Sequence, residues 1–179
     1  MNTSLRYEAG AVTKPINTVF DFSKDQGILR AVEKCNGSGD CRKSELIGGT
    51  MCPSFMATRD EKNSTRARAN ILREFLTNSD KKNPFDHQEI YEVMDLCLSC
   101  KGCKSECPSS VDVAKLKAEF LQHYYDEHGA SLRSKMIANI SSLNKLGSYF
   151  PWAYNFFIKN KFLSGLMADT VGFAKERKF

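Results

Sequence analysis

The stretch CLSCKGCKSECP, residues 97–108, decides the expected fold and chemistry of this chain. It places three cysteines two residues apart, a fourth cysteine after three more residues, and a proline directly behind the fourth. This spacing is that of the bacterial iron–sulfur run, because three thiolates on a tight turn can wrap one face of a cubane cluster. We expect Gly102 to supply the backbone freedom that such a turn needs.

The same spacing predicts which cysteines share a cluster. Proline disfavours helical geometry at the residue before it, so Cys107 is expected to point away from the other three thiols. In two-cluster proteins the fourth cysteine of such a run binds the other cluster. Cys52 also precedes a proline, and we expect it to take the fourth place. The predicted 4Fe-4S cluster is therefore held by Cys52, Cys97, Cys100 and Cys103.

A second ligand set lies earlier in the chain and is incomplete. Cys35 and Cys41 are separated by five residues, the spacing of the outer pair in C-x2-C-x2-C, and Ser38 occupies the middle position. Together with Cys107 these residues supply three thiolates. Three alternatives stay open here: a 3Fe-4S cluster, a 4Fe-4S cluster with Ser38 or an exogenous group as fourth ligand, and a site without a cluster.

Other uses of the cysteines agree less well with their spacing. Zinc also binds four thiolates, but zinc modules usually pair C-x2-C knuckles and do not run three cysteines together. Seven cysteines in 179 residues is an odd number, and too few for a secreted disulfide scaffold. Residues 1–10 lack the apolar segment of a signal peptide, so we expect a cytoplasmic protein, with the inner face of the membrane as an alternative.

Periodic signals along the chain are almost all helical, which predicts an all-α fold with long cysteine-bearing loops. Apolar side chains recur at helical spacing in residues 28–34, 64–78, 86–97, 110–129 and 132–146. The exception is an alternating stretch at residues 19–22, which is compatible with one short strand.

Charge is spread along the chain, with a formal net charge of +5. No basic block with interleaved aromatic residues is present, so nucleic-acid binding is not expected. Arg66, Arg68 and Arg73 are expected to form a solvated helix face; the alternative is that such cations lie beside a cluster and raise its reduction potential. No acid–base or nucleophile constellation is visible, so we predict no catalytic residue and no complete active site in this chain.

The C-terminal part of the chain is unusually rich in large apolar residues. They are Trp152, Phe156, Phe157, Phe162, Leu163, Leu166, Met167 and Phe173. Core packing is the simplest interpretation, and the alternatives are a docking surface for another domain or subunit and a peripheral membrane contact aided by Lys159, Lys161 and Lys175. No uncharged run reaches the roughly 20 apolar residues of a membrane-spanning helix.

Four motifs resemble one family. They are CNGSGDCRK (35–43), GGTMCPSFMATRDEK (48–62), TRARANILREFL (65–76) and CLSCKGCKSECP (97–108). Together they resemble the iron–sulfur region of FAD-linked oxidoreductases of the D-lactate and D-2-hydroxyglutarate dehydrogenase type. They are also similar, more distantly, to the iron–sulfur subunits of anaerobic glycerol-3-phosphate dehydrogenase and glycolate oxidase. The resemblance covers roughly residues 16–147.

The resemblance implies an α-helical ferredoxin-like domain, which we place at residues 23–130, between an extended lead-in segment (1–22) and a C-terminal helical docking segment (131–179). It implies electron transfer from an FAD-binding dehydrogenase domain or subunit, often with a cysteine-rich domain downstream. Because this chain has no Gly-rich dinucleotide motif, FAD is expected only on a partner, and the chain is expected to be a detached subunit or a segment of a longer polypeptide. The alternative function is a structural or docking module whose zinc ion or redox-silent cluster only fixes the fold.

Overall fold

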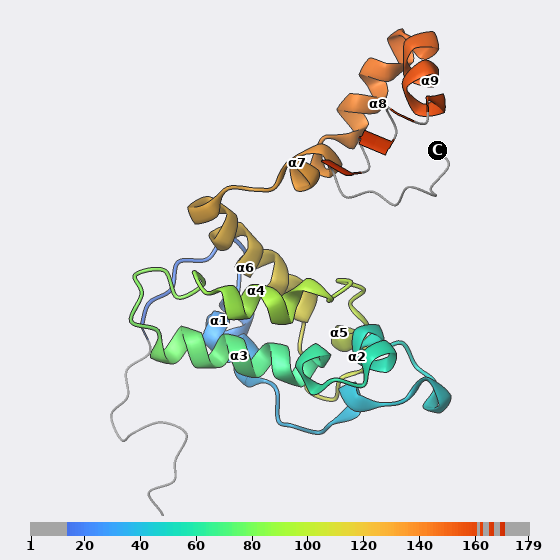
Figure 1. Ribbon diagram of the computed structural model, residues 1–179. Helices are drawn as coiled ribbons and strands as arrows, with labels where there is room; N and C mark the ends of the chain where they lie inside the picture. Colours follow the sequence, from blue (N-terminus) through green and yellow to red (C-terminus); the bar gives the residue numbers. More distant parts are fainter. Residues whose placement is uncertain (1–13, 161, 163–164, 167–168, 171–179) are drawn as a thin grey trace, which may run out of the picture. The chain divides into compact units, whose positions relative to one another are not determined.

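The computed structural model describes residues 14–160 and, beyond them, residues 162, 165–166 and 169–170. All regular structure in this part of the chain is helical, which confirms the predicted all-α fold (Figure 1). The short strand predicted at residues 19–22 is wrong. The backbone N–H groups of Val19 and Phe20 donate to the buried carboxylate of Glu119, at 2.7 and 2.9 Å, and the chain bends there.

The chain divides into two compact units, the first ending at Glu127 and the second beginning at His128, and each is described by itself. Helices that begin in the first unit are α1 (Ile28–Glu33), α2 (Pro53–Thr58), α3 (Thr65–Asn78), α4 (Gln88–Asp95), α5 (Gly102–Glu106) and α6 (Val113–His128). Short 3-10 turns lie at Ser23–Asp25, Asp40–Arg42, Glu45–Ile47 and Glu61–Asn63.

The two long helices of the first unit begin at side-chain caps. The Ser64 hydroxyl accepts a hydrogen bond from the Ala67 N–H at 3.0 Å and caps α3. The Asp112 carboxylate accepts from the Lys115 N–H at 3.1 Å at the start of α6. Gly129, with φ +76°, follows the last residue of α6 and adopts the left-handed conformation that commonly ends helices.

The core of the first unit lies between α1, α3, α4 and α6. Helix α3 packs against both α1 and α4. Leu72, Ile90, Met94, Leu116 and Phe120 belong to one buried cluster, and none is more than 1% exposed. Burial of such side chains contributes roughly 1.5–3 kcal/mol each. This packed helical frame holds the loops that carry the cysteines.

The second unit contains α7 (Leu132–Ala138), α8 (Ile140–Tyr149) and α9 (Pro151–Lys159). The single helix predicted over residues 132–146 is wrong, because Asn139 leaves helical geometry (φ −102°, ψ 16°) and its side-chain amide donates to the Lys135 carbonyl at 2.8 Å. No helix within the described ranges is long and apolar enough to cross a membrane.

Core packing of the C-terminal apolar residues is also wrong where the structure describes them. Trp152, Phe156, Phe162 and Leu166 are all more than half exposed. The cause is local: three short helices of 7 to 10 residues present apolar side chains on more surface than they can cover among themselves. The side chains of Phe157, Leu163, Met167 and Phe173 lie outside the described residues.

Candidate metal centre

The loop from Cys97 to Cys103 is a tight turn built on left-handed residues. Ser99 and Lys101, which flank Cys100, have φ values of +54° and +61°. Non-glycine residues seldom adopt this conformation, and it persists only where the surroundings enforce it. Alternating right- and left-handed residues turn successive N–H groups toward one side, which makes an anion-binding concavity.

Gly102 does not have the role expected from the sequence. Its φ is not positive, and the left-handed residues of this loop are Ser99 and Lys101. A Cβ at Gly102 would instead lie 2.9 Å from the Thr50 carbonyl oxygen and 3.1 Å from its hydroxyl. Glycine is therefore needed here because α5 approaches the segment before Cys52 closely, so the two cysteine-bearing segments lie against each other.

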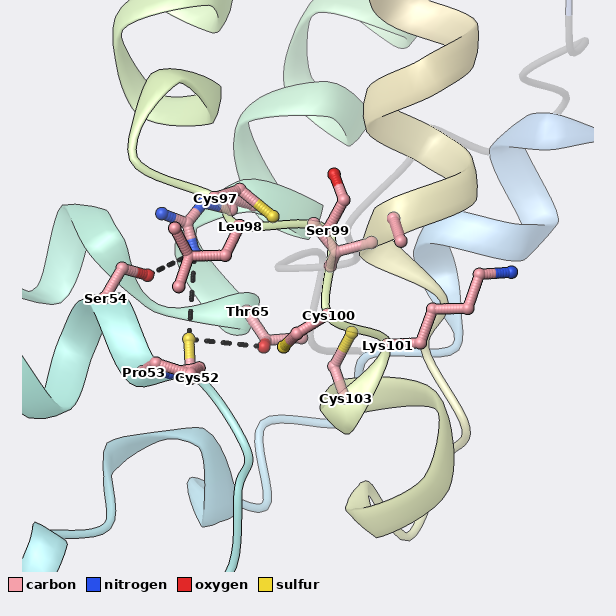
Figure 2. Close-up of a pocket in the computed structure, with 13 residues that line it drawn as sticks. Cys52, Pro53, Ser54, Thr65, Cys97, Leu98, Ser99, Cys100, Lys101 and Cys103 are labelled. Carbon is pink, nitrogen blue, oxygen red and sulfur yellow. Dashed lines mark hydrogen bonds between the residues drawn. The ribbon is translucent and has the colours of Figure 1, made fainter. Parts of the chain in front are cut away.

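One pocket brings together four cysteines from segments that are far apart in the sequence. Cys52, Cys97, Cys100 and Cys103 all line it, together with Thr65 and Arg68 of α3 and the first residues of α6. Figure 2 shows these four cysteine side chains around the same space. Cys52 and Cys103 are buried, Cys97 is half-buried and Cys100 is exposed. The predicted first ligand set thus lines one cavity, and its assignment to a cluster stays a prediction.

Cys52 occupies a strained backbone position directly before α2. Its φ and ψ are +62° and +60°, which differs from the extended backbone of the other Cys-Pro cysteine, Cys107 (φ −73°, ψ 129°). The Cys52 Sγ lies 3.3 Å from the Asn63 carbonyl oxygen and 3.5 Å from the Thr65 hydroxyl. Left-handed geometry at a non-glycine residue costs of order 1–3 kcal/mol, and such outliers concentrate at functional sites.

The Cys103 thiol lies at the N-terminus of α6. Burial raises its pKa, while the backbone N–H groups of Val113 and Ala114 lower it. These N–H groups belong to the first turn of α6, where the helix dipole favours negative charge. The fold therefore excludes water from this sulfur and supplies hydrogen-bond donors to its thiolate.

Glu106 holds the two cysteine segments together. Its carboxylate accepts hydrogen bonds from the Thr50 N–H (2.7 Å), the Thr50 hydroxyl (2.6 Å) and the Met51 N–H (3.1 Å). These bonds lower the pKa of Glu106, the Thr50 hydroxyl most strongly. Gly49, with φ +89°, lets the backbone pass, since a Cβ there would lie 2.6 Å from the carboxylate. No role for Glu106 was predicted from the sequence. Its position between Cys103 and Cys107 is the sequence feature that could have indicated one.

The second predicted set is brought together only in part. Burial raises the pKa of Cys41, the backbone N–H of Arg66 in α3 lowers it, and Cys52 and Cys35 lie near enough to raise it further. Ser38 is exposed, and its N–H donates to the Asn36 side chain at 3.1 Å. Cys107 is half-buried and packs against the hydrophobic core. A site shared by Cys35, Cys41, Cys107 and Ser38 stays a prediction.

The predicted solvated position of Arg68 is wrong, because this residue is only 2% exposed. Its Nε donates to the Val93 carbonyl (3.0 Å), and its Nη1 donates to the Ser54 hydroxyl (3.0 Å) and lies 3.7 Å from the Cys52 Sγ. Arg68 lies three residues after Thr65 and four before Leu72, on the buried face of α3. That helical spacing is the signal by which the sequence could have revealed it.

The residues around the pocket fit an anionic iron–sulfur group. A cubane cluster binds four thiolates at separate corners, and the core with its four thiolates carries a charge of about −2. The pocket offers four thiols and the cationic Arg68, whose buried Nη2 has no hydrogen-bond partner. Among the described residues, no three His, Cys, Asp or Glu side chains converge closely enough to hold a single metal ion.

Comparison with known proteins indicates the same kind of cofactor. Residues 34–112 match the family model of the 4Fe-4S dicluster domain. The chain is 29% identical to a D-2-hydroxyglutarate dehydrogenase of Pseudomonas putida over 170 residues, covering 77% of this chain and 17% of that protein. It is 28% identical to a D-2-hydroxyglutarate dehydrogenase of Escherichia coli over 178 residues, covering 80% of this chain and 17% of that protein.

The chain thus spans about a sixth of the length of the curated relatives that it matches. No solved structure matches it. The matched residues begin just before Cys35 and end just after Cys107, so they include every cysteine of the chain. The expected iron–sulfur cofactor is confirmed by this match. Residues 34–112 are thus similar to the 4Fe-4S dicluster domain, and the resemblance of the chain to oxidoreductases of the D-2-hydroxyglutarate dehydrogenase type is confirmed.

Proposed function

We propose that this chain is the electron-transfer module of an FAD-linked dehydrogenase, which takes electrons from a reduced flavin on a partner domain and passes them to a further acceptor. The observation that carries the proposal is the single pocket lined by Cys52, Cys97, Cys100 and Cys103. When bound, an iron–sulfur cluster supplies one-electron redox chemistry. The chain's own residues hold the cluster, bury part of it and supply hydrogen-bond donors to its sulfur ligands.

The substrate side of the proposal rests on the relatives. Those reported above are named D-2-hydroxyglutarate dehydrogenases, and a 2-hydroxy acid is the class of substrate whose oxidation would reduce the partner flavin. No group in this chain is assigned to that oxidation. We therefore propose that substrate chemistry takes place on the partner and that this chain serves only the electron path.

The test is anaerobic reconstitution of the chain with iron and sulfide. We expect a brown protein with about 4 irons for one cluster, or 7 to 8 for two, whose colour bleaches with dithionite and whose reduced form gives an EPR signal. A colourless protein with one zinc per chain, or a cluster that dithionite does not reduce, would favour the structural module over electron transfer.

The partner is proposed to dock on the second unit. Its exposed apolar residues include Leu146, Tyr149, Phe150, Trp152 and Phe156. Exposed apolar groups gathered in this way mark interaction surfaces. Residues 128–179 also hold eight lysines and arginines against two acidic residues, so the composition of this part of the chain is basic. We propose an FAD-binding dehydrogenase domain as the occupant, with a membrane surface as the competing one.

Trp152 is the only tryptophan of the chain and reports directly on this surface. It is 76% exposed, so its emission is expected at the long wavelength of a hydrated indole. Addition of the FAD-binding domain should shift the emission to shorter wavelength, while vesicles containing anionic lipid should leave it unchanged. A shift with vesicles and none with the flavoprotein would assign the surface to the membrane.

A further inference from the structure

We propose that Arg68 is a positioning residue for the cluster: its free Nη2–H donates a hydrogen bond to a sulfur of the cluster and raises the cluster's reduction potential. This inference rests on the proposed function, since it assigns one residue of this chain to the group held in the pocket.

Arg68 is a buried cation that forms no ion pair with the described residues. Arg68 is 2% exposed, and arginine is almost never fully buried unless it is paired. None of the ion pairs among the described residues includes it, and its three neighbours are a carbonyl, a hydroxyl and a thiol. An uncompensated buried charge is strongly unfavourable. The guanidinium therefore requires a nearby anion. Among the described side chains around it, only a cysteine thiolate could supply one.

One hydrogen-bond donor of Arg68, Nη2, has no partner among the described residues. Arg68 Nε and Nη1 both have partners, whereas Nη2 is buried and has none among the described residues. Buried polar groups nearly always have a partner, and an exception calls for an explanation such as an ion. Arg68 lines the pocket of Cys52, Cys97, Cys100 and Cys103, and we therefore take the group bound in this pocket as the partner of Nη2.

Two hydrogen bonds fix the orientation of the Arg68 guanidinium. Val93 belongs to α4 and Ser54 to α2, so the guanidinium is held between two helices while its own backbone belongs to α3. Because the guanidinium is planar, fixing two of its nitrogens fixes the direction of the third. The donor is thus oriented before the cluster binds. Hydrogen bonds to the sulfurs of a cluster stabilise its more negative, reduced state and raise its reduction potential.

The experiment measures the midpoint potential of the reconstituted full chain by EPR-monitored redox titration. We expect Arg68→Gln to shift the potential to more negative values, and Arg68→Lys, which keeps the charge but lacks the planar fork, to shift it less. Arg66→Gln is the matched control, because Arg66 lies on the same helix, has a side chain 43% exposed and faces Glu61 at 3.9 Å. An Arg68→Gln protein with full iron content and an unchanged potential would overturn the inference.

A second measurement covers variants that do not retain the cluster. Arg68→Met removes the buried charge and also the hydrogen bonds to Val93 and Ser54. If Arg68 donates to the cluster, this substitution should destabilise the loaded chain more than the cluster-free chain, and it should speed the loss of iron to a chelator. If Arg68 only joins α2, α3 and α4, the two forms should be destabilised equally, which would contradict the inference. Failure of the parent chain to take up iron and sulfide would contradict the proposed function and, with it, the role of Arg68, whereas an unchanged potential in a loaded Arg68→Gln protein would contradict the role of Arg68 alone.

Discussion

The two cysteine loops, residues 35–41 and 97–103, have left-handed residues at the same two positions and differ in the residue at their centre. Gly37 and Gly39 have φ values of +78° and +83°, and Ser99 and Lys101, at the same positions of their loop, have φ values of +54° and +61°. In each loop the last cysteine is buried, and its pKa is lowered by backbone N–H groups of a long helix: one from α3 in the first loop and two from α6 in the second. The central residue is Ser38 in one and Cys100 in the other.

This difference separates what the backbone provides from what the side chain provides. The loop at 35–41 keeps the left-handed residues, the buried third cysteine and the helix N-terminus of a cluster-binding turn, and it lacks one sulfur. It uses glycine at both left-handed positions, where that conformation is free of steric cost, whereas the complete loop holds serine and lysine there at a cost in strain. We infer that the shape of the second site is present and that its ligand set is short by one thiolate.

The largest expected effect is the loss of the first cluster in Cys103→Ser. Cys103 is the most deeply buried residue of the three cysteines in its loop, so a hydroxyl there replaces a soft ligand at a buried position. Iron analysis should find about 4 fewer irons per chain, with the visible absorption of that cluster lost.

Cys41→Ser is the matched control for Cys103→Ser, because it changes the corresponding position of the other loop. It should leave the iron and sulfide of the first cluster in place. Loss of the same visible absorption and the same EPR signal in both variants would show that the two loops serve a single site, and would contradict the division into two ligand sets.

Ser38→Cys is expected to have the next largest effect, in the opposite direction. It places a thiol at the centre of a loop that already has the required backbone, so the second site gains a full set with Cys35, Cys41 and Cys107. Iron content should rise to about 8 per chain, with a second EPR signal after reduction. Ser38→Ala should not raise it. An unchanged iron content in Ser38→Cys would mean that something other than the missing sulfur prevents binding.

The sequence and the structure agree where local rules decide the outcome. Helical periodicity predicted α3 and α6 nearly to their ends, and the Cys-Pro rule predicted the extended backbone at Cys107. The same rule does not describe Cys52, which is left-handed because its loop is held by contacts with Asn63 and Thr65 that are distant in sequence. Arg68 has the helical spacing of the buried face of α3, but its charge made a solvated position the expectation from sequence. The partners of both residues, Asn63 and Thr65 for Cys52 and Val93 and Ser54 for Arg68, come from tertiary structure that the local pattern does not specify.

Gly102→Ala is expected to have an intermediate effect on stability. The added Cβ meets the Thr50 carbonyl at 2.9 Å, and backbone cannot move aside as a flexible side chain can. Overpacking of this kind costs about 1–3 kcal/mol, which chemical denaturation of the chain should detect as a lower free energy of unfolding. Asp40→Ala changes the corresponding residue of the first loop, which is partly exposed, and should cost less. Equal costs would contradict the close approach between α5 and the segment before Cys52.

The smallest expected effect is that of Glu106→Gln, and it depends on pH. Hydrogen bonds from Thr50 and Met51 lower the pKa of Glu106 in the folded chain, so its stabilising contribution is present above the pKa of an unfolded glutamate, about 4.3, and is lost as pH falls through the lower folded value. Thermal unfolding should therefore show the parent more stable than Glu106→Gln at pH 7, with the difference shrinking below about pH 4.

Glu92→Gln, an exposed position on α4, should show no such difference at either pH. A gap between parent and Glu106→Gln that persists unchanged in acid would mean that shape rather than charge joins the two cysteine segments. Met51 precedes Cys52-Pro53 as Glu106 precedes Cys107-Pro108, so only the segment after the complete loop has a carboxylate at this position. Such a result would mean that the charge of this carboxylate is not the important difference between the two cysteine loops.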